Sequence, residues 1–424
     1  MHHKKVLGTL TTAMMLIGSC QTYANSTEQY QLEQVVTLVR HGIRPQTNTE
    51  ALNQATGKTW PTWSVPDGHL TARGYAGIVN QAQYQIGLWQ QQGLAFTQTQ
   101  PCETQQNQLF IWAAPDERTQ KTAQAFATGI NPQCHFSVNV SKYDQDPLFD
   151  ALKMGSAESV FKEIKQQFKQ KIVSQDQVQA RYHNAGQSLK SAVCAPDSCQ
   201  FLSEPWKLKL SQKGQPKLSG PASEGANIGE TIRLQYSENF PLDQVAFGHV
   251  HNANDVKNLM QLHQAKYVYL NEIMPYAQMG GSILYQQILK ALSTTQTSSP
   301  LHRPLVVFVG HDTNISEIKT LLGFHWQLPQ YLADDIPPGG SLTFSKYKEL
   351  KTNKQFVKID FSARTLDQWR QLTPLSSQQP LPQATLQYNY CKPTPVGTLC
   401  PLEQFLHDAQ KNIVPMAIKQ PLFE

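Results

Sequence analysis

Two arginines and a histidine follow an apolar stretch near the start of the chain. Residues 35–39 read Val-Val-Thr-Leu-Val, a run typical of a buried strand, and residues 40–44 read Arg-His-Gly-Ile-Arg. A strand of an open α/β sheet delivers such side chains to its carboxyl end, where these sheets bind their ligands. Guanidinium groups match phosphate oxygens, and a neutral imidazole nitrogen can attack phosphorus. The pattern predicts phosphoryl transfer; the alternative is an ordinary strand end whose charges face water.

Two further apolar runs, at residues 109–113 and 305–309, also predict buried strands that end on charged residues. The first leads to Asp116 and Arg118, and the second leads to the pair His311–Asp312. Asp116 suits the N-cap of a helix over residues 120–128, which would place Arg118 on the first turn, where free N–H groups favour an anion. Three charged strand ends on one sheet predict a single site.

These side chains supply the groups that hydrolysis of a phosphate monoester needs. His41 can attack phosphorus, while Asp312 can protonate the alkoxide leaving group and then deprotonate water. A protonated His311 would add a hydrogen bond to the phosphate. The acid roles of Asp312 and His311 predict activity below neutral pH, and the scheme requires no metal ion and no cofactor. Neutralisation of the phosphate oxygens is assigned to Arg40, Arg44 and Arg118.

Helical patterns surround the strands. A helix is predicted at residues 70–89 after a loop at 45–68, and helical periodicity dominates residues 151–292. Residues 214–225 are interpreted as a polar loop, and Asp334 and Asp335 as turn residues. The last part predicts strands at 341–344 and 356–359 and a helix at 402–413. We expect a catalytic core of residues 25–150 and 296–424, with a largely helical insertion at residues 151–295.

The composition is that of a globular protein with a polar surface. The chain of 424 residues is 40% hydrophobic and 16% charged, with a formal net charge of +5, and it is long enough for two domains or one domain with an insertion. No run of lysine and arginine forms a nucleic-acid-binding stripe. We therefore expect a small-molecule phosphate monoester as the partner and no nucleic acid. Nor does any stretch after residue 24 predict a membrane span.

Residues 1–24 resemble an export signal. Lys4 and Lys5 precede a short apolar core at residues 6–18, and Thr-Tyr-Ala at 22–24 fits a cleavage site after Ala24. Residues 17–20, Ile-Gly-Ser-Cys, offer the alternative of a lipid anchor at Cys20. We favour simple cleavage. Either route predicts a periplasmic or otherwise exported protein.

The cysteines fit an oxidising compartment. Seven are present, and six remain when Cys20 is set aside. Because no Cys-x-x-Cys pair occurs, disulfides are favoured over a metal site. Nearest-neighbour pairing, one of several connectivities, predicts the bridges Cys102–Cys134, Cys194–Cys199 and Cys391–Cys400.

Taken together, the motifs resemble the signature of the histidine acid phosphatases. The resemblance rests on residues 40–44, 116–119 and 311–314, and extends to residues 70–74, 146–149 and 337–340 and to the cysteine pattern. Within the family, the chain is most similar to bacterial periplasmic phytases and glucose-1-phosphatases. The resemblance implies a three-layer α/β core with a mixed, largely parallel sheet like that of phosphoglycerate mutases, plus an inserted, mostly helical domain. It also implies the roles given above to His41, Asp312, Arg40, Arg44, Arg118 and His311.

The sequence departs from the family pattern just after the first motif. Gln46 occupies the usual place of a proline, which could shift the loop that bears Arg44. Asn48 stands where bacterial phytases often carry a lysine that helps to hold a highly charged inositol phosphate. Residues 234–236 and 240–246 resemble the glucose-1-phosphatases. These differences weaken the case for a phytase without excluding it.

Three alternatives to an exported phosphatase are weaker. Enzymes like phosphoglycerate mutase are mostly cytoplasmic and lack the His-Asp pair and the disulfides. A protein that only binds phosphorylated ligands needs neither a nucleophile at His41 nor a proton donor at Asp312. A structural lipoprotein would depend on Cys20 alone and would leave the three charged strand ends unexplained.

Overall fold

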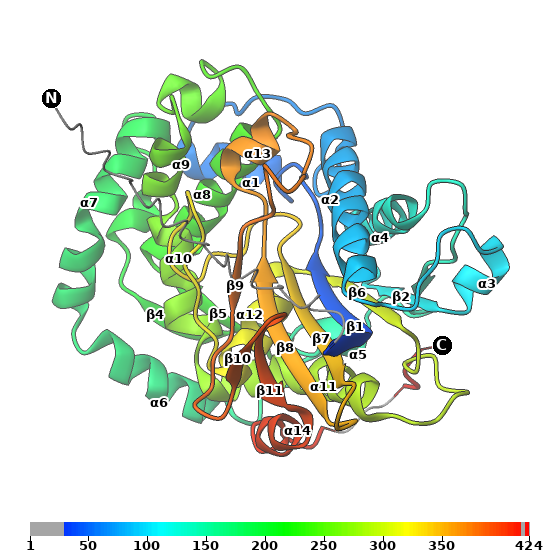
Figure 1. Ribbon diagram of the computed structural model, residues 1–424. Helices are drawn as coiled ribbons and strands as arrows, with labels where there is room; N and C mark the ends of the chain where they lie inside the picture. The colour runs from blue at the N-terminus through cyan, green and yellow to red at the C-terminus, as the bar shows by residue number, and fades with distance from the viewer. Residues whose placement is uncertain (1–28, 417–419, 424) are drawn as a thin grey trace, which may run out of the picture.

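A nine-stranded mixed sheet forms the centre of the molecule (Figure 1). The computed structural model describes residues 29–416 and 420–423; the predicted export signal at residues 1–24, with Cys20, lies outside these ranges. The strand order is β10-β11-β8-β7-β1-β6-β2-β3, and β9 pairs with β8. The strands are β1 (Tyr30–Arg40), β2 (Leu109–Ala113), β3 (Asn139–Val140), β6 (Leu305–Gly310), β7 (Ser341–Glu349), β8 (Gln355–Ser362), β9 (Gln383–Thr385), β10 (Lys392–Thr394) and β11 (Gly397–Pro401).

Parallel and antiparallel pairings occupy different halves of this sheet. Strands β1, β6, β2 and β3 are parallel neighbours. From β1 outward through β7, β8 and β11 to β10, every pairing is antiparallel, as is that of β9 with β8. The α/β class and the mixed sheet are confirmed, but the antiparallel share is larger than a largely parallel sheet implies. The reason is that β7 and β8 are joined by a short turn, which can only connect antiparallel strands.

Helices cover both faces of the sheet. Because side chains alternate along a strand, β1 packs Val35 and Val39 with the helices on one face and Val36 and Leu38 with those on the other. The helices of the first face are α2 (Ala72–Gln91) and α4 (Glu117–Ile130), and those of the second are α11 (Met274–Ser293), α12 (Asp312–Leu322) and α14 (Leu402–Gln410). The result is the expected arrangement of three layers.

Helices also dominate residues 151–295, most of which lie to one side of the sheet (Figure 1). They surround a separate hydrophobic cluster that contains Phe168, Trp206 and Tyr269. The interpretation of residues 214–225 as a polar loop was wrong: this segment holds β5 and the start of α8, and Leu218 packs into the same cluster. The boundaries at residues 150 and 296 stay a prediction. The elements are α6 (Phe161–Ile172), α7 (Gln175–Val193), β4 (Lys207–Leu210), β5 (Pro216–Ser219), α8 (Pro221–Ser237), α9 (Ala253–Leu259), α10 (Gln261–Lys266) and a π-helical turn at Tyr267–Asn271.

Several short helices were not predicted from the sequence. Within the expected loop at 45–68 lies α1 (Thr49–Thr56), whose N-cap is Asn48: its Oδ1 accepts a hydrogen bond of 2.8 Å from the N–H of Ala51. Gly57, with φ of 66°, ends this helix in the left-handed conformation. The remaining short helices are α3 (Cys102–Gln106), α5 (Pro147–Asp150) and α13 (Leu366–Arg370).

The disulfide prediction is confirmed. The structure pairs Cys102 with Cys134, Cys194 with Cys199, and Cys391 with Cys400. Within residues 29–416 and 420–423, no helix combines the length and hydropathy needed to cross a membrane.

Candidate active site

The three charged strand ends meet at one edge of the sheet. Arg40, the last residue of β1, lies opposite Gly310 of β6, and Ala113 of β2 lies opposite Val309 of β6. The backbone N–H of His41 donates a hydrogen bond of 3.0 Å to the carbonyl oxygen of Gly310. The parallel register therefore brings together all the predicted site segments, which follow β1, β2 and β6.

Close packing against the start of α2 fixes the loop after β1. The N–H of Thr71 donates to the carbonyl oxygen of Ile43 at 2.9 Å. A Cβ atom on Gly74 would lie 2.6 Å from that same oxygen, so a larger residue at this position would force the backbones apart. Gly42, whose N–H donates to Thr122 Oγ1 at 3.0 Å, has the same tight surroundings. These contacts explain why residues 70–74 accompany the first motif.

His41 is buried and held in one orientation. Its exposed fraction is 2%, and its Nδ1 lies 2.8 Å from the carbonyl oxygen of Gly42. A carbonyl only accepts, so Nδ1 carries the proton and Nε2 keeps its lone pair. Burial, together with the charges of Arg118 and Arg40, holds the pKa of His41 well below its usual value. The imidazole is therefore neutral at mildly acidic pH, the state that a nucleophile requires.

Three arginines surround His41, and each retains a buried nitrogen for which the described part of the chain offers no partner. This nitrogen is Nε in Arg40, Arg44 and Arg118. Other nitrogens of the same groups are engaged: Arg44 Nη1 donates to the carbonyl oxygen of Pro45 at 2.7 Å, and Arg118 Nη1 lies 3.2 Å from Asp116 Oδ1. Burial, aided by Arg118, lowers the pKa of Arg44 to about 10. Three partly satisfied guanidinium groups form a binding site for an anion with several oxygens.

His311 is the N-cap residue of α12, but its side chain faces Asp116. Its Nε2 lies 2.9 Å from Asp116 Oδ2. The expectation about Asp116 was correct for its position at the N-cap of α4, yet its carboxylate makes no capping hydrogen bond there, because it binds His311 and Arg118 instead. Burial lowers the pKa of His311, and Asp116 opposes this shift.

Asp312 opens α12 and faces Arg40. Its Oδ2 lies 3.2 Å from Arg40 Nη2, and its Oδ1 accepts a hydrogen bond of 2.9 Å from the N–H of Thr313. Burial would raise the pKa of Asp312, but the surrounding groups that lower it, of which Arg40 has the largest effect, together outweigh burial and hold the pKa well below the usual value. When only the charges of the protein act on it, with no substrate bound, Asp312 is a carboxylate at mildly acidic pH.

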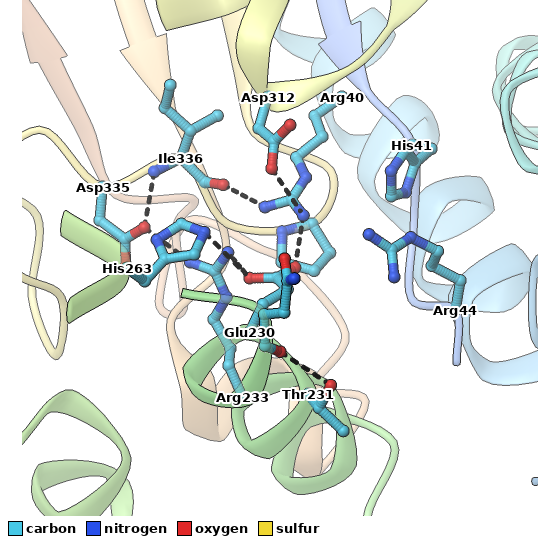
Figure 2. A network of polar contacts seen from close by, with 12 residues as sticks. Arg40, His41, Arg44, Glu230, Thr231, Arg233, His263, Asp312, Asp335 and Ile336 are labelled. Atoms are coloured by element: carbon cyan, nitrogen blue, oxygen red, sulfur yellow. Dashed lines mark hydrogen bonds and ion pairs between the residues drawn. The ribbon is translucent and has the colours of Figure 1, made fainter. Parts of the chain in front are cut away.

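Sequence reasoning missed a second group of buried charges beside Arg40 (Figure 2). Glu230 of α8 pairs with Arg40 and with Arg233 of the same helix. Arg233 in turn pairs with Asp335, which was interpreted only as a turn residue. The available signal was the presence of two opposite charges among the apolar residues of one predicted helix. Because a charge on a helix normally faces water, that signal was too weak to use.

Comparisons with known proteins agree with this geometry. The family model described as the histidine phosphatase superfamily (branch 2) matches residues 31–362. The chain is 28% identical to a glucose-1-phosphatase of Salmonella typhimurium over 95% of its own length and 97% of the relative's. It is also 28% identical to the Escherichia coli phytase AppA, with 97% and 99% covered. The crystal structure of a Klebsiella phytase superposes with a TM-score of 0.85 at 34% identity, covering 92% of this chain and 97% of that one. The chain belongs to branch 2 of the histidine phosphatase superfamily.

Proposed function

We propose that this protein is an acid phosphatase that hydrolyses phosphate monoesters through a phosphohistidine at His41. One observation carries the proposal. A neutral imidazole that keeps the lone pair of Nε2 lies among three guanidinium groups, each with a buried Nε that has no partner among the described residues. A phosphate group placed there meets both the positive charge that its oxygens require and a nucleophile for its phosphorus.

The reaction divides into two displacements. In the first, His41 Nε2 forms a bond to phosphorus while the bond from phosphorus to the ester oxygen breaks, and the departing alkoxide takes a proton from Asp312. In the second, the Asp312 carboxylate accepts a proton from water as the water oxygen attacks phosphorus. The bond from phosphorus to Nε2 then breaks and releases inorganic phosphate. Arg40, Arg44 and Arg118 hold the phosphate oxygens throughout.

The proton on Asp312 must arrive with the substrate. Without substrate, Asp312 is ionised, because Arg40 and the other nearby groups that lower its pKa together outweigh the effect of burial. A phosphate group bound at the arginines adds negative charge beside it and raises this pKa. Below a pH of about 6, a phosphate monoester is largely a monoanion and brings a proton of its own. Hence we expect activity to fall as the pH rises above about 6.

The residues near the site favour a substrate with a single phosphate group. Asn48 caps α1 and adds no charge at the position where phytases often carry a lysine. Lys153 acts electrostatically on Asp116 and His311, but its Nζ is already paired with Asp150 at 2.6 Å. We therefore propose a sugar phosphate such as glucose-1-phosphate as the preferred substrate, ahead of phytate.

We also propose that the protein is exported. Three disulfides within the described residues support this location, since such bonds persist in oxidising compartments. Cell fractionation tests the location. Incorporation of labelled palmitate into the wild type but not into Cys20→Ser would favour the lipid anchor over cleavage after Ala24.

The decisive experiment measures phosphate release at about pH 5, with and without a metal chelator, from p-nitrophenyl phosphate, glucose-1-phosphate and phytate. Wild type is compared with His41→Ala and Asp312→Asn, and the surface variant His251→Ala serves as the matched control. Activity that survives the chelator and is lost in His41→Ala supports the proposal. If folded wild type binds inorganic phosphate but hydrolyses none of the three esters, the protein is a binding protein instead.

A further inference from the structure

Two carboxylates share one nitrogen of Arg40. Glu230 Oε1 lies 2.5 Å from Arg40 Nη2, and Asp312 Oδ2 lies 3.2 Å from the same nitrogen (Figure 2). Glu230 comes from α8 and Asp312 from the start of α12, so two distant segments compete for one guanidinium group. In this competition Glu230 has the closer contact.

A closed ring of contacts holds Glu230 in place. Its second oxygen pairs with Arg233 Nη2, and Arg233 Nη1 lies 2.6 Å from Asp335 Oδ1. Asp335 also accepts a hydrogen bond of 2.8 Å from the N–H of Ile336, whose carbonyl oxygen accepts from Arg40 Nη1. The ring therefore begins and ends at the same arginine.

The ring is buried and its formal charges cancel. Arg40 and Arg233 are fully buried, Glu230 is 7% exposed and Asp335 is 9% exposed. Paired with both arginines, Glu230 has its pKa lowered to about 2, although burial alone would raise it. Two cations and two anions sum to zero, so Asp312 is the extra negative charge next to Arg40.

We propose that Glu230 is a positioning residue that keeps Arg40 from pairing fully with Asp312, and so leaves Asp312 able to carry the proton that an alcohol leaving group needs. The inference rests on the proposed phosphatase function and deepens it. Arg233 sets the strength of the competition, because it draws Glu230 away from Arg40. The other titratable or charged groups that act on Asp312 are His41, Arg44, His263, Tyr267 and Glu317.

Substitutions of Glu230 and of Arg233 should shift the pH dependence of kcat in opposite directions. In Glu230→Gln, Asp312 is the only carboxylate still paired with Arg40, so the carboxylate form of Asp312 is stabilised. The basic limb of the profile of kcat against pH then moves to lower pH. In Arg233→Gln, Glu230 keeps Arg40 and His263, whose Nε2 lies 3.5 Å from Glu230 Oε2, but loses its second arginine. Glu230 then pairs more strongly with Arg40, so Asp312 is released and the basic limb moves to higher pH. A residue needed only for folding would not produce opposite shifts.

The test records kcat against pH for glucose-1-phosphate and p-nitrophenyl phosphate with wild type, both single variants and the double variant. For glucose-1-phosphate we expect a shift of about one pH unit down in Glu230→Gln, equal to about a tenfold loss above the limb. We expect an upward shift in Arg233→Gln and a limb near that of wild type in the charge-neutral double variant. p-Nitrophenyl phosphate, whose leaving group needs little protonation, should change far less. Glu238→Gln, at the end of the same helix and bonded to Thr71 Oγ1 at 2.6 Å, is the matched control.

The outcomes separate this inference from the proposed function. Wild type that hydrolyses neither ester overturns the function itself. Active wild type with unmoved limbs, or with equal losses on both esters, overturns the role of Glu230 alone. If Glu230→Gln does not fold, Glu230→Asp replaces it, because the shorter side chain weakens the contact with Arg40 and must shift the limb in the same direction.

Discussion

His41 Nδ1 lies 2.8 Å from the carbonyl oxygen of the next residue, Gly42. This contact fixes both the tautomer and the direction of Nε2, so the nucleophile is oriented by the turn that carries it. Substitution of His41 by alanine should lower kcat by a factor of about 10⁴ or more, because the covalent route is lost. The fold should persist, since only one buried side chain is shortened.

Alkaline quenching of wild type with ³²P-labelled substrate should trap a phosphoenzyme that acid destroys, which is the behaviour of a phosphohistidine. His41→Ala should trap none, and His251→Ala should behave like wild type. Label that survives acid would instead indicate an acceptor other than histidine.

Arg118 should contribute mainly to phosphate binding. Its side chain is 16% exposed, and its Nε is buried without a partner among the described residues. Loss of one charge-assisted hydrogen bond corresponds to an increase of about ten- to a hundredfold in KM and in the inhibition constant of inorganic phosphate. Arg118→Ala should show both increases. The exposed Arg181→Ala is the control, and unchanged phosphate inhibition in Arg118→Ala would remove this residue from the site.

The sequence was sufficient for the strands that build the site. Strands β1, β2 and β6 are buried on both faces, so their sequences are continuous apolar runs, and the charged residues that end them stand out. It was not sufficient for the contact that Asp116 makes. The preference of aspartate for an N-cap is local, whereas its actual partner, His311, lies 195 positions further along the chain.

The ring around Glu230 was beyond sequence reasoning for a similar reason. A helical pattern predicts that charges face water, and only a partner from another segment can reverse this. That partner is Arg40 for Glu230 and Asp335 for Arg233. Strands as short as β3 and β9 were missed because two or three residues show no alternation.

Acid should destabilise the fold through His263. This side chain is 6% exposed, and burial, with a contribution from Arg233, lowers its pKa from 6.5 to about 4. The unfolded chain therefore binds a proton near pH 6.5 that the folded protein accepts only near pH 4. Between these values the free energy of unfolding falls as the pH falls, by up to about 3 kcal/mol.

Urea unfolding at pH 7 and at about pH 4.5 tests this shift. His263→Phe keeps an aromatic ring against Tyr267, 5.0 Å away between centroids, and removes the titration. It should lose less stability on acidification than wild type does, while exposed His183→Phe should lose as much. An equal loss in all three proteins would show that His263 is protonated in the folded state.

A disulfide that closes a longer segment of the chain should contribute more to stability. Cys102 and Cys134 are 32 positions apart, whereas Cys194 and Cys199 are 5 apart. The entropy of the unfolded loop gives about 3 to 4 kcal/mol for the first and about 2 kcal/mol for the second. Urea unfolding of Cys102→Ala/Cys134→Ala and Cys194→Ala/Cys199→Ala should follow this order. The reverse order would show that the short bridge acts by fixing the contact between Cys199 and α1, where the N–H of Cys199 donates to the carbonyl oxygen of Ala55 at 3.0 Å.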